Sequence, residues 1–321
     1  MNAKDRFYSR KWGVFNHYLS VLQNDSTTPN SYGKQTDWDT LVNEFDVQTL
    51  VKNLREMGAG YYVITVMQGS KFMIAPNATF DKIAGTKPGE ACSTRDLIGE
   101  IAEELEKCDI DLFLYFTGDG PYKNHPEGDR FGFVEPRSVG VTKSFVEKWA
   151  SVLEEYAVRY GDKVKGWWID GCYKEYFKYT DELLEIFYKA CKKGNPNALV
   201  SLNNGVGAGD IIAGYTYEDF LCGEQEDFTV IPKQRFYGNA QSHILAPLGL
   251  PPKGVNEELL VDMIGPGWGS FGVKRDKEYM ADYIRRVNEA GGVVTVDIGV
   301  YRDGKFDPAQ VEVLKYVGKN I

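Results

Sequence analysis

The chain has 321 residues, a formal net charge of −9 and an isoelectric point near 5.1. This balance disfavours nucleic acid and anionic membranes as partners, because both require clustered Lys and Arg. No apolar run reaches the roughly 18 residues of a membrane-spanning helix, and the N-terminus lacks the apolar segment of a signal peptide, so a cytoplasmic protein is expected. The five cysteines form no C-x-x-C pair or metal-finger spacing, which indicates free thiols in a reducing compartment.

Short apolar runs rich in β-branched and aromatic residues recur along the chain and predict buried strands. These runs cover residues 11–18, 61–67, 111–117, 166–170, 198–204 and 292–299, with a shorter candidate at 220–224. Residues 227–256 contain several Pro and Gly without a clean period, so this segment is expected to be mostly loop.

Amphipathic segments with capping residues separate these strands and predict helices. Asp46 is expected to cap a helix that Gly58 ends, Ser93 to open a second helix, and Ser144 with Glu147 to form the capping box of a third. Further helices are expected at residues 181–193, 278–289 and 308–317.

Strands that alternate with helices over connections of a dozen or more residues are typical of a parallel sheet. About eight strands, with no break in composition and no linker, predict one (β/α)8-like TIM barrel, a single catalytic domain over residues 1–321. A doubly wound open sheet is the alternative, but no glycine-rich phosphate loop follows the first strand.

The strand G-W-W-I-D ends at Asp170, which Gly171 follows. In α/β barrels the carboxyl ends of the strands carry the catalytic side chains, so Asp170 is a candidate catalytic acid. The simpler interpretation is a turn, since Asp-Gly is a common turn dipeptide.

Other kinds of chemistry have little support in the sequence. The three histidines share no metal-binding spacing and there is no G-x-S-x-G elbow, so neither a metal nor a cofactor is expected. Aromatic residues make up 13% of the chain, and sugars stack on aromatic rings. Glycoside hydrolysis needs two carboxyl groups. The second acid could be any of five whose spacing does not separate them: Glu218, Asp219, Glu224, Glu226 and Asp227.

Several motifs, in order, resemble those of the α-L-fucosidases of glycoside hydrolase family 29. They are W-G-V-F-N-H-Y (12–18), G-A-G-Y-Y-V-I-T (58–65), S-T-R-D-L-I-G-E (93–100), W-W-I-D-G (167–171), L-N-N-G (202–205), D-F-L-C-G-E (219–224), G-W-G-S-F-G (267–272) and the closing segment 291–304. The resemblance implies that the barrel is irregular and that the protein is a retaining exo-glycosidase that forms a covalent glycosyl-aspartate, with Asp170 as the nucleophile and Glu224 as the acid/base. It does not extend to the C-terminal β-sandwich that the family frequently carries.

The expected partner is a small-molecule or oligosaccharide substrate, and nothing in the sequence indicates an oligomeric state. His17 lies at the family's sugar-binding histidine, and aromatic and polar residues from five other segments are expected to line the same pocket. The candidate substrate-binding residues are His17, Gln68, Tyr115, Trp168, Asn204 and Trp268.

One departure from the family pattern concerns the sugar. Where the family carries K-H-H-D-G-F, this chain has M-Q-G-S-K-F, so Gln68 and Gly69 replace two histidines. A glycine cannot donate to a hydroxyl and is expected to leave a void, so the specificity is expected to move away from fucose. The alternative is a sugar-binding protein that kept the barrel and lost turnover.

Overall fold

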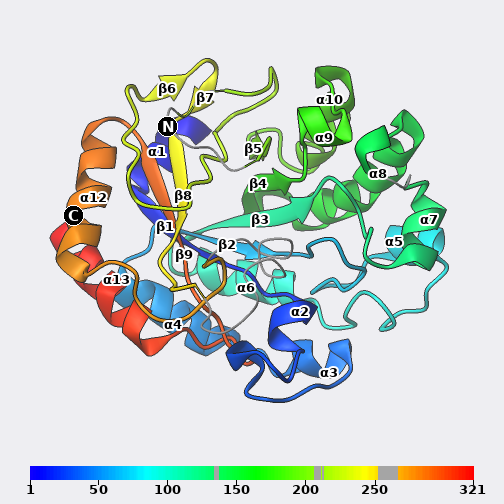
Figure 1. Cartoon of the computed structure of the whole chain (residues 1–321), viewed down its shortest axis with the longest axis horizontal. Helices are drawn as coiled ribbons and strands as arrows, with labels where there is room; N and C mark the ends of the chain where they lie inside the picture. Colours follow the sequence, from blue (N-terminus) through cyan, green and yellow to red (C-terminus); the bar gives the residue numbers. More distant parts are fainter. Residues whose placement is uncertain (134–136, 206–210, 212, 252–266) are drawn as a thin grey trace.

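The computed structural model describes residues 1–133, 137–205, 211, 213–251 and 267–321. Seven parallel strands curl into one sheet in the order β5-β4-β3-β2-β1-β9-β8, with helices around its outside (Figure 1). The strands are β1 (Trp12–Asn16), β2 (Tyr61–Thr65), β3 (Asp111–Thr117), β4 (Val164–Asp170), β5 (Leu199–Leu202), β8 (His243–Pro247) and β9 (Val293–Asp297). The predicted α/β barrel class is confirmed.

The helices connect successive strands and bury one face against the sheet. Their bounds are α1 (Ala3–Ser9), α2 (Ser20–Gln23), α3 (Trp38–Asn43), α4 (Val47–Met57), α5 (Ala78–Ala84), α6 (Leu97–Glu106), α7 (His125–Phe131), α8 (Lys143–Tyr160), α9 (Lys174–Phe177), α10 (Asp181–Cys191), α12 (Lys277–Glu289) and α13 (Pro308–Asn320). Among the described residues, no helix is both long and apolar enough to cross a membrane.

Two predicted helix starts are wrong. Helix α6 begins after Asp96, whose carboxylate accepts from Gly99 N, and not at Ser93. Ser93 lies before the helix, and its N–H donates to Met73 O at 2.9 Å. Helix α8 is capped by Thr142, whose hydroxyl accepts from Phe145 N, so the Ser144–Glu147 capping box does not form.

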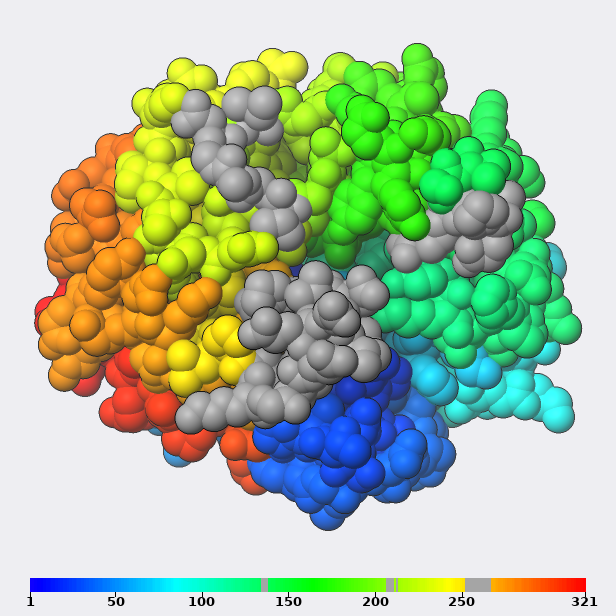
Figure 2. Space-filling model, viewed as in Figure 1, coloured from blue at the N-terminus to red at the C-terminus, as the bar shows by residue number. Residues whose placement is uncertain are grey.

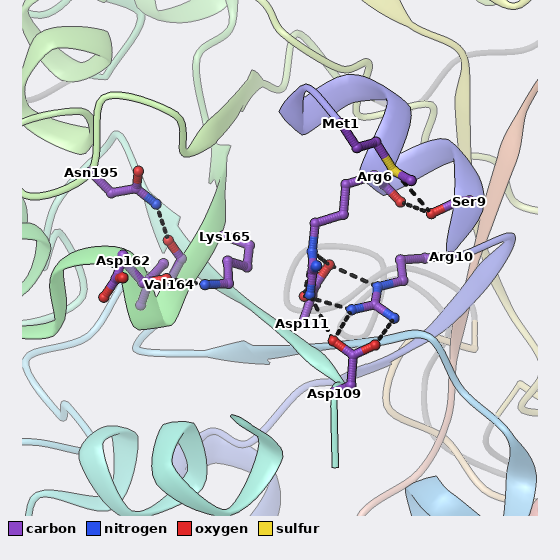
Figure 3. A network of polar contacts seen from close by, with 10 residues as sticks. All are labelled: Met1, Arg6, Ser9, Arg10, Asp109, Asp111, Asp162, Val164, Lys165 and Asn195. Carbon is purple, nitrogen blue, oxygen red and sulfur yellow. Dashed lines mark hydrogen bonds and ion pairs between the residues drawn. The ribbon is translucent and has the colours of Figure 1, made fainter. Parts of the chain in front are cut away.

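The amino end of the barrel is closed by α1, a helix that the sequence did not predict. Its Phe7 packs against rings from three parts of the barrel wall: Tyr61, Phe113 and Phe220 lie 5.1–5.2 Å away between ring centroids. Figure 3 shows Arg6 reaching the buried Asp111 at the start of β3, with Nη2 2.6 Å from Oδ1. Apolar packing and ion pairs therefore hold α1 in place.

The barrel is completed between β5 and β8 by an irregular segment, residues 219–225. Asp219 N donates to Val200 O of β5 at 2.8 Å, and Gln225 N donates to Leu245 O of β8 at 2.8 Å. The strand expected at 220–224 is therefore two isolated bridges, Phe220 with Gln241 and Glu224 with Leu245. We call residues 219–225 the seam.

The segment 227–256, expected to be mostly loop, also contains three strands that the sequence did not predict; residues 252–256 lie outside the described residues. It contains the hairpin strands β6 (Phe236–Tyr237) and β7 (Ala240–Gln241), followed by the barrel strand β8. The sequence H-I-L-A-P of β8 is buried throughout, so it shows no alternation that would mark a strand.

Candidate active site

Asp170 is the last residue of β4, at the carboxyl end of the barrel, where three donors lie within 2.8 Å of its carboxylate oxygens. Gly171 N donates to Oδ1 at 2.7 Å, Asn203 Nδ2 donates to Oδ1 at 2.8 Å, and the Tyr115 hydroxyl donates to Oδ2 at 2.5 Å. Burial and the nearby charge of Asp170 raise the pKa of Tyr115 well above its usual value, so the phenol remains a donor. These donors orient the carboxylate at the end of β4, where it can act as a nucleophile.

Glu224 lies in the seam and shares a partner with Asp170. The same Asn203 Nδ2 that contacts Asp170 donates to Glu224 Oε2 at 2.6 Å. The two carboxylate oxygens are therefore no more than about 5.4 Å apart, the sum of the two distances, whereas inverting glycosidases separate their carboxyl groups by about 6.5–9.5 Å.

The two carboxyl groups differ in their surroundings. Burial, and after it the charge of Asp170, raise the pKa of Glu224 to about 8, although the hydrogen bond from Asn203 acts in the opposite direction. Glu224 is therefore protonated at neutral pH and can donate a proton, while hydrogen-bond donors surround Asp170. This pairing of an acid with a carboxylate is what retaining glycoside hydrolysis uses.

The four other candidate acids lie apart from Asp170 or are engaged elsewhere. Asp219 pairs with Lys192 at 2.6 Å, and Asp227 pairs with Arg275 at 2.5 Å. Glu226 is exposed. Glu218 accepts from the backbone of Gly214 at 2.9 Å, and burial raises its pKa to about 7.

His17, just beyond β1, is held by an acid at the end of β9. Its Nδ1 lies 2.7 Å from Asp297 Oδ2, and Asp297 Oδ1 accepts from Gly269 N at 2.6 Å. The fully buried Asp297 orients the imidazole through Nδ1 and leaves Nε2 for another partner. This arrangement favours His17 as a sugar ligand.

Three of the predicted aromatic residues line the same end of the barrel interior. Tyr115 stacks on Trp168 with ring centroids 5.1 Å apart and planes 19° apart, and Trp268 lies 6.2 Å from the His17 ring. Trp168 is 2% exposed, and its Nε1 has no hydrogen-bond partner within the described part of the chain. Of these rings, Tyr115 is the one that contacts a candidate catalytic acid.

The region of Gln68 and Gly69 differs from the expectation of a void. Gly69 has a positive φ of 62°, and a Cβ built on it would lie 2.6 Å from Tyr122 Cε1 and 3.3 Å from Lys123 Cε. Tyr122 and Lys123 therefore fill the space that the sequence suggested was open. Gln68 Oε1 is buried without a hydrogen-bond partner among the residues described.

Asn204 and Asn203 are neighbours in the chain but lie in different surroundings. Asn204 is exposed, and its Oδ1 accepts from Lys174 N at 2.8 Å and from the Tyr215 hydroxyl at 3.2 Å. Asn203 is 1% exposed and contacts both carboxylates.

Sequence reasoning missed Asn203, Asp297 and Tyr173, whose hydroxyl lies 3.4 Å from Asp170 Oδ1. Asp297 carries the same signal that marked Asp170, an acid that ends an apolar strand. No comparable signal distinguished Asn203 from Asn204.

Asp170 and Glu224 are both partly exposed. Figure 2 shows a hollow between the green surface of the segments around β4 and β5 and the yellow-green surface of the segment before β8. In the described residues, no group of three His, Cys, Asp or Glu side chains is arranged to hold a metal ion.

Two carboxyl groups held this close at the carboxyl end of an α/β barrel are the arrangement that retaining glycoside hydrolases use. The family model described as α-L-fucosidase matches residues 2–243. The chain therefore belongs to the α-L-fucosidase family and is a glycoside hydrolase.

Solved structures share the fold at low sequence identity. A family 29 α-L-fucosidase from Bacteroides thetaiotaomicron, trapped as a covalent intermediate with 2-fluoro-fucosyl fluoride, is 19% identical with a TM-score of 0.65, over 99% of this chain and 74% of that one. The α-L-fucosidase AlfC from Lactobacillus casei, in complex with α-L-fucose, is 16% identical with a TM-score of 0.63. The match covers 99% of this chain and 97% of that one.

A third similar structure is an endo-fucoidan hydrolase, MfFcnA4, from glycoside hydrolase family 107. It is 12% identical with a TM-score of 0.68, over 98% of this chain and 53% of that one. No curated protein sequence matches the chain.

Proposed function

We propose that this protein is a retaining exo-glycosidase that releases a terminal sugar of the α-L-fucose type through a covalent glycosyl-aspartate at Asp170. The observation that carries the proposal is the shared amide of Asn203, which limits the distance between the facing oxygens of Asp170 and Glu224. A separation this short leaves no room for the water molecule that an inverting enzyme places between its two acids.

The reaction proceeds in two steps. In the first, the Asp170 carboxylate forms a bond to the anomeric carbon while the glycosidic C–O bond breaks, and the leaving oxygen takes the proton of Glu224. In the second, Glu224, now ionised, takes a proton from water; the oxygen of this water bonds to the anomeric carbon, and the sugar–aspartate ester breaks. Both residues return to their starting protonation states.

Covalent labelling tests the assignment of the nucleophile. A 2-deoxy-2-fluoro-α-L-fucosyl fluoride should inactivate the enzyme and add one sugar to the peptide that contains Asp170, as measured by peptide mass spectrometry. Asp170→Asn should abolish the labelling and lower kcat/KM by at least about a thousandfold, because the variant lacks the attacking oxygen. Glu226→Gln is the control, since this exposed acid lies two residues from Glu224. A label on any other acid would overturn the assignment.

The proposed enzyme prefers a sugar other than the fucose of simple α-L-fucosides. The sugar pocket has His17 with Gln68 in place of further imidazoles, and Tyr122 occupies the space beside Gly69. A hydrogen bond to a well-oriented partner contributes about one to two decades of kcat/KM, so its loss changes which sugar is preferred. We expect weak hydrolysis of simple aryl α-L-fucosides.

Steady-state kinetics with a panel of aryl glycosides measure this preference. The panel compares α-L-fucoside with α-L-galactoside and β-D-arabinopyranoside, which share its ring stereochemistry but differ in the substituent on C5. Gln68→His should raise kcat/KM on the fucoside by about tenfold or more, because it restores an imidazole. A wild-type kcat/KM on the fucoside above about 10⁴ M⁻¹s⁻¹ would contradict the proposed shift.

A further inference from the structure

The buried amide of Asn203 contacts both candidate catalytic acids, and its orientation is fixed independently of them. Its Oδ1 accepts from Gly205 N at 2.9 Å, so the other end of the amide must be the NH2 group. That group has two hydrogens, one for Asp170 Oδ1 at 2.8 Å and one for Glu224 Oε2 at 2.6 Å. The donor capacity of the nitrogen is fully used.

The backbone of Asn203 is anchored to the nucleophile strand. Its N–H donates to Ile169 O at 2.7 Å, and its carbonyl accepts from Cys172 N at 3.0 Å. These bonds bracket Asp170 on both sides in the chain. Asn203 therefore moves with β4, whereas Glu224 belongs to the seam, which has no regular ladder.

We infer that Asn203 is a positioning residue that holds the nucleophile and the acid/base at a fixed separation and reserves Glu224 Oε1 for the transferable proton. The inference rests on the proposed function. Because Nδ2–H donates to Oε2, that oxygen acts as an acceptor, and the proton of the neutral carboxyl lies on Oε1. No hydrogen bond from a described residue to Oε1 is present in the structure, so this oxygen can face the leaving group.

The electrostatic surroundings agree with this role. The charged groups whose fields act on Glu224 are Asp170, Asp297 and Glu226, and all three raise its pKa; the hydrogen bond from Asn203 lowers it. Removal of the amide should therefore increase the pKa of Glu224 further. It also removes one of the donors that hold Asp170, so both acids are affected together.

Two substitutions at position 203 distinguish the loss of the hydrogen-bond donor from the loss of side-chain volume. Asn203→Asp keeps the shape but replaces the NH2 group with a carboxylate oxygen, which repels the Asp170 carboxylate and cannot donate to Glu224, and Asn203→Ala removes the group. The control is Ser201→Ala, a buried residue two positions earlier on β5 whose hydroxyl lies 3.2 Å from Cys222 Sγ. Thermal melting identifies the variants that fold.

We expect kcat/KM to fall about 10–100-fold in Asn203→Ala and further in Asn203→Asp, because a hydrogen bond to a charged group is lost. The basic limb of the pH profile of Asn203→Ala should move upward by about one pH unit. A purely structural residue would lower the rate or the melting temperature without moving this limb. In Ser201→Ala the basic limb of the pH profile should stay where it is in the wild type.

Carbon-13 NMR of labelled glutamate carboxyls, with the Glu224 signal assigned through Glu224→Gln, follows the same titration without turnover. If the wild type hydrolyses no glycoside but the Glu224 titration moves in Asn203→Ala, the proposed function fails and the bridging role stands. If the wild type is active and neither the titration nor the rate changes in whichever Asn203 variant folds, the inference is wrong.

Discussion

At the residue scale, the two proposed catalytic acids are similar groups in unlike settings. Asp170 receives hydrogen bonds from a backbone amide, a phenol and a carboxamide, whereas Glu224 receives one from Asn203 and lies beside the charge of Asp170. The surroundings therefore distinguish the two acids, since burial beside a like charge favours the neutral form of Glu224.

This difference predicts the basic limb of the pH profile. Glu224 must be protonated to assist the leaving group, and its pKa is raised to about 8, so kcat/KM should be full well below pH 8 and fall as the pH rises through about 8. Glu224→Ala should lose this limb, and azide should restore its turnover of substrates with good leaving groups. The measurement is kcat/KM against pH for a glycoside with a poor leaving group. A basic limb that persists in Glu224→Ala would assign the acid to another residue.

The sequence identified Asp170 because an acid that ends an apolar strand has a strong positional signal. It could not select Glu224 from five neighbouring acids, because their orientations depend on how the seam bridges β5 and β8. It also could not separate Asn203 from Asn204, because one residue of register along an extended chain turns a side chain from one face to the other. Which of the two asparagines contacts the acids depends on tertiary hydrogen bonds, and these have no pattern in the sequence.

At the scale of elements, Gly223 determines where Glu224 stands. Its φ is 58°, in the left-handed region that favours glycine, and a Cβ at this position would lie 1.8 Å from His243 O. The backbone of the seam and that of β8 touch here without a side chain between them. A larger residue must move the seam, and Glu224 is the next residue in the chain.

We therefore expect Gly223→Ala to lower both activity and stability. Displacement of Glu224 should reduce kcat/KM by about a hundredfold or more, because an error of about 1 Å in a catalytic group has this effect. Gly132→Ala is the matched control: Gly132 also has a positive φ, of 87°, but a Cβ added there would meet no atom within 4 Å, so only a modest loss of stability is expected. Kinetics and thermal melting measure both variants; equal effects in the two would contradict the close-approach argument.

The elements that sequence analysis missed share a physical cause. Strand β8 is buried on both faces and ends at Pro247, so it has neither an alternating pattern nor the composition of a typical strand. Helix α1 is seven residues long and buries a single side chain, Phe7, so its apolar pattern is too short to recognise. Both elements are stabilised by the barrel and not by their own sequences.

At the scale of the whole molecule, the two ends of the barrel have separate tasks. The amino end is closed by Phe7 and by the ion pairs of Arg6 and Arg10 with Asp109 and Asp111 (Figure 3). The carboxyl end holds the two acids, which are partly exposed. In barrels of this kind the amino end serves stability and the carboxyl end serves catalysis.

Phe7→Ala tests this division. Removal of a buried phenylalanine should lower the free energy of unfolding by about 3–5 kcal/mol, while kcat/KM of the folded enzyme stays close to the wild-type value. Urea unfolding and kinetics on the same preparation provide both numbers. Phe236→Ala is the control, since Phe236 is 36% exposed and its loss should have little effect on stability. A fall in kcat/KM of the folded Phe7→Ala enzyme would show that the two ends are coupled.

The seam has a consequence for how enzymes with this barrel can diverge. Asp170 is locked into the register of β4 with β3, so a residue inserted before it would turn it out of the barrel. Glu224 lies on a stretch paired through isolated bridges, where residues can be added or removed without a shift in the register of the other strands. Of the two acids, the proposed proton donor is therefore the one whose position insertions and deletions can change, while the proposed nucleophile stays at the end of its strand.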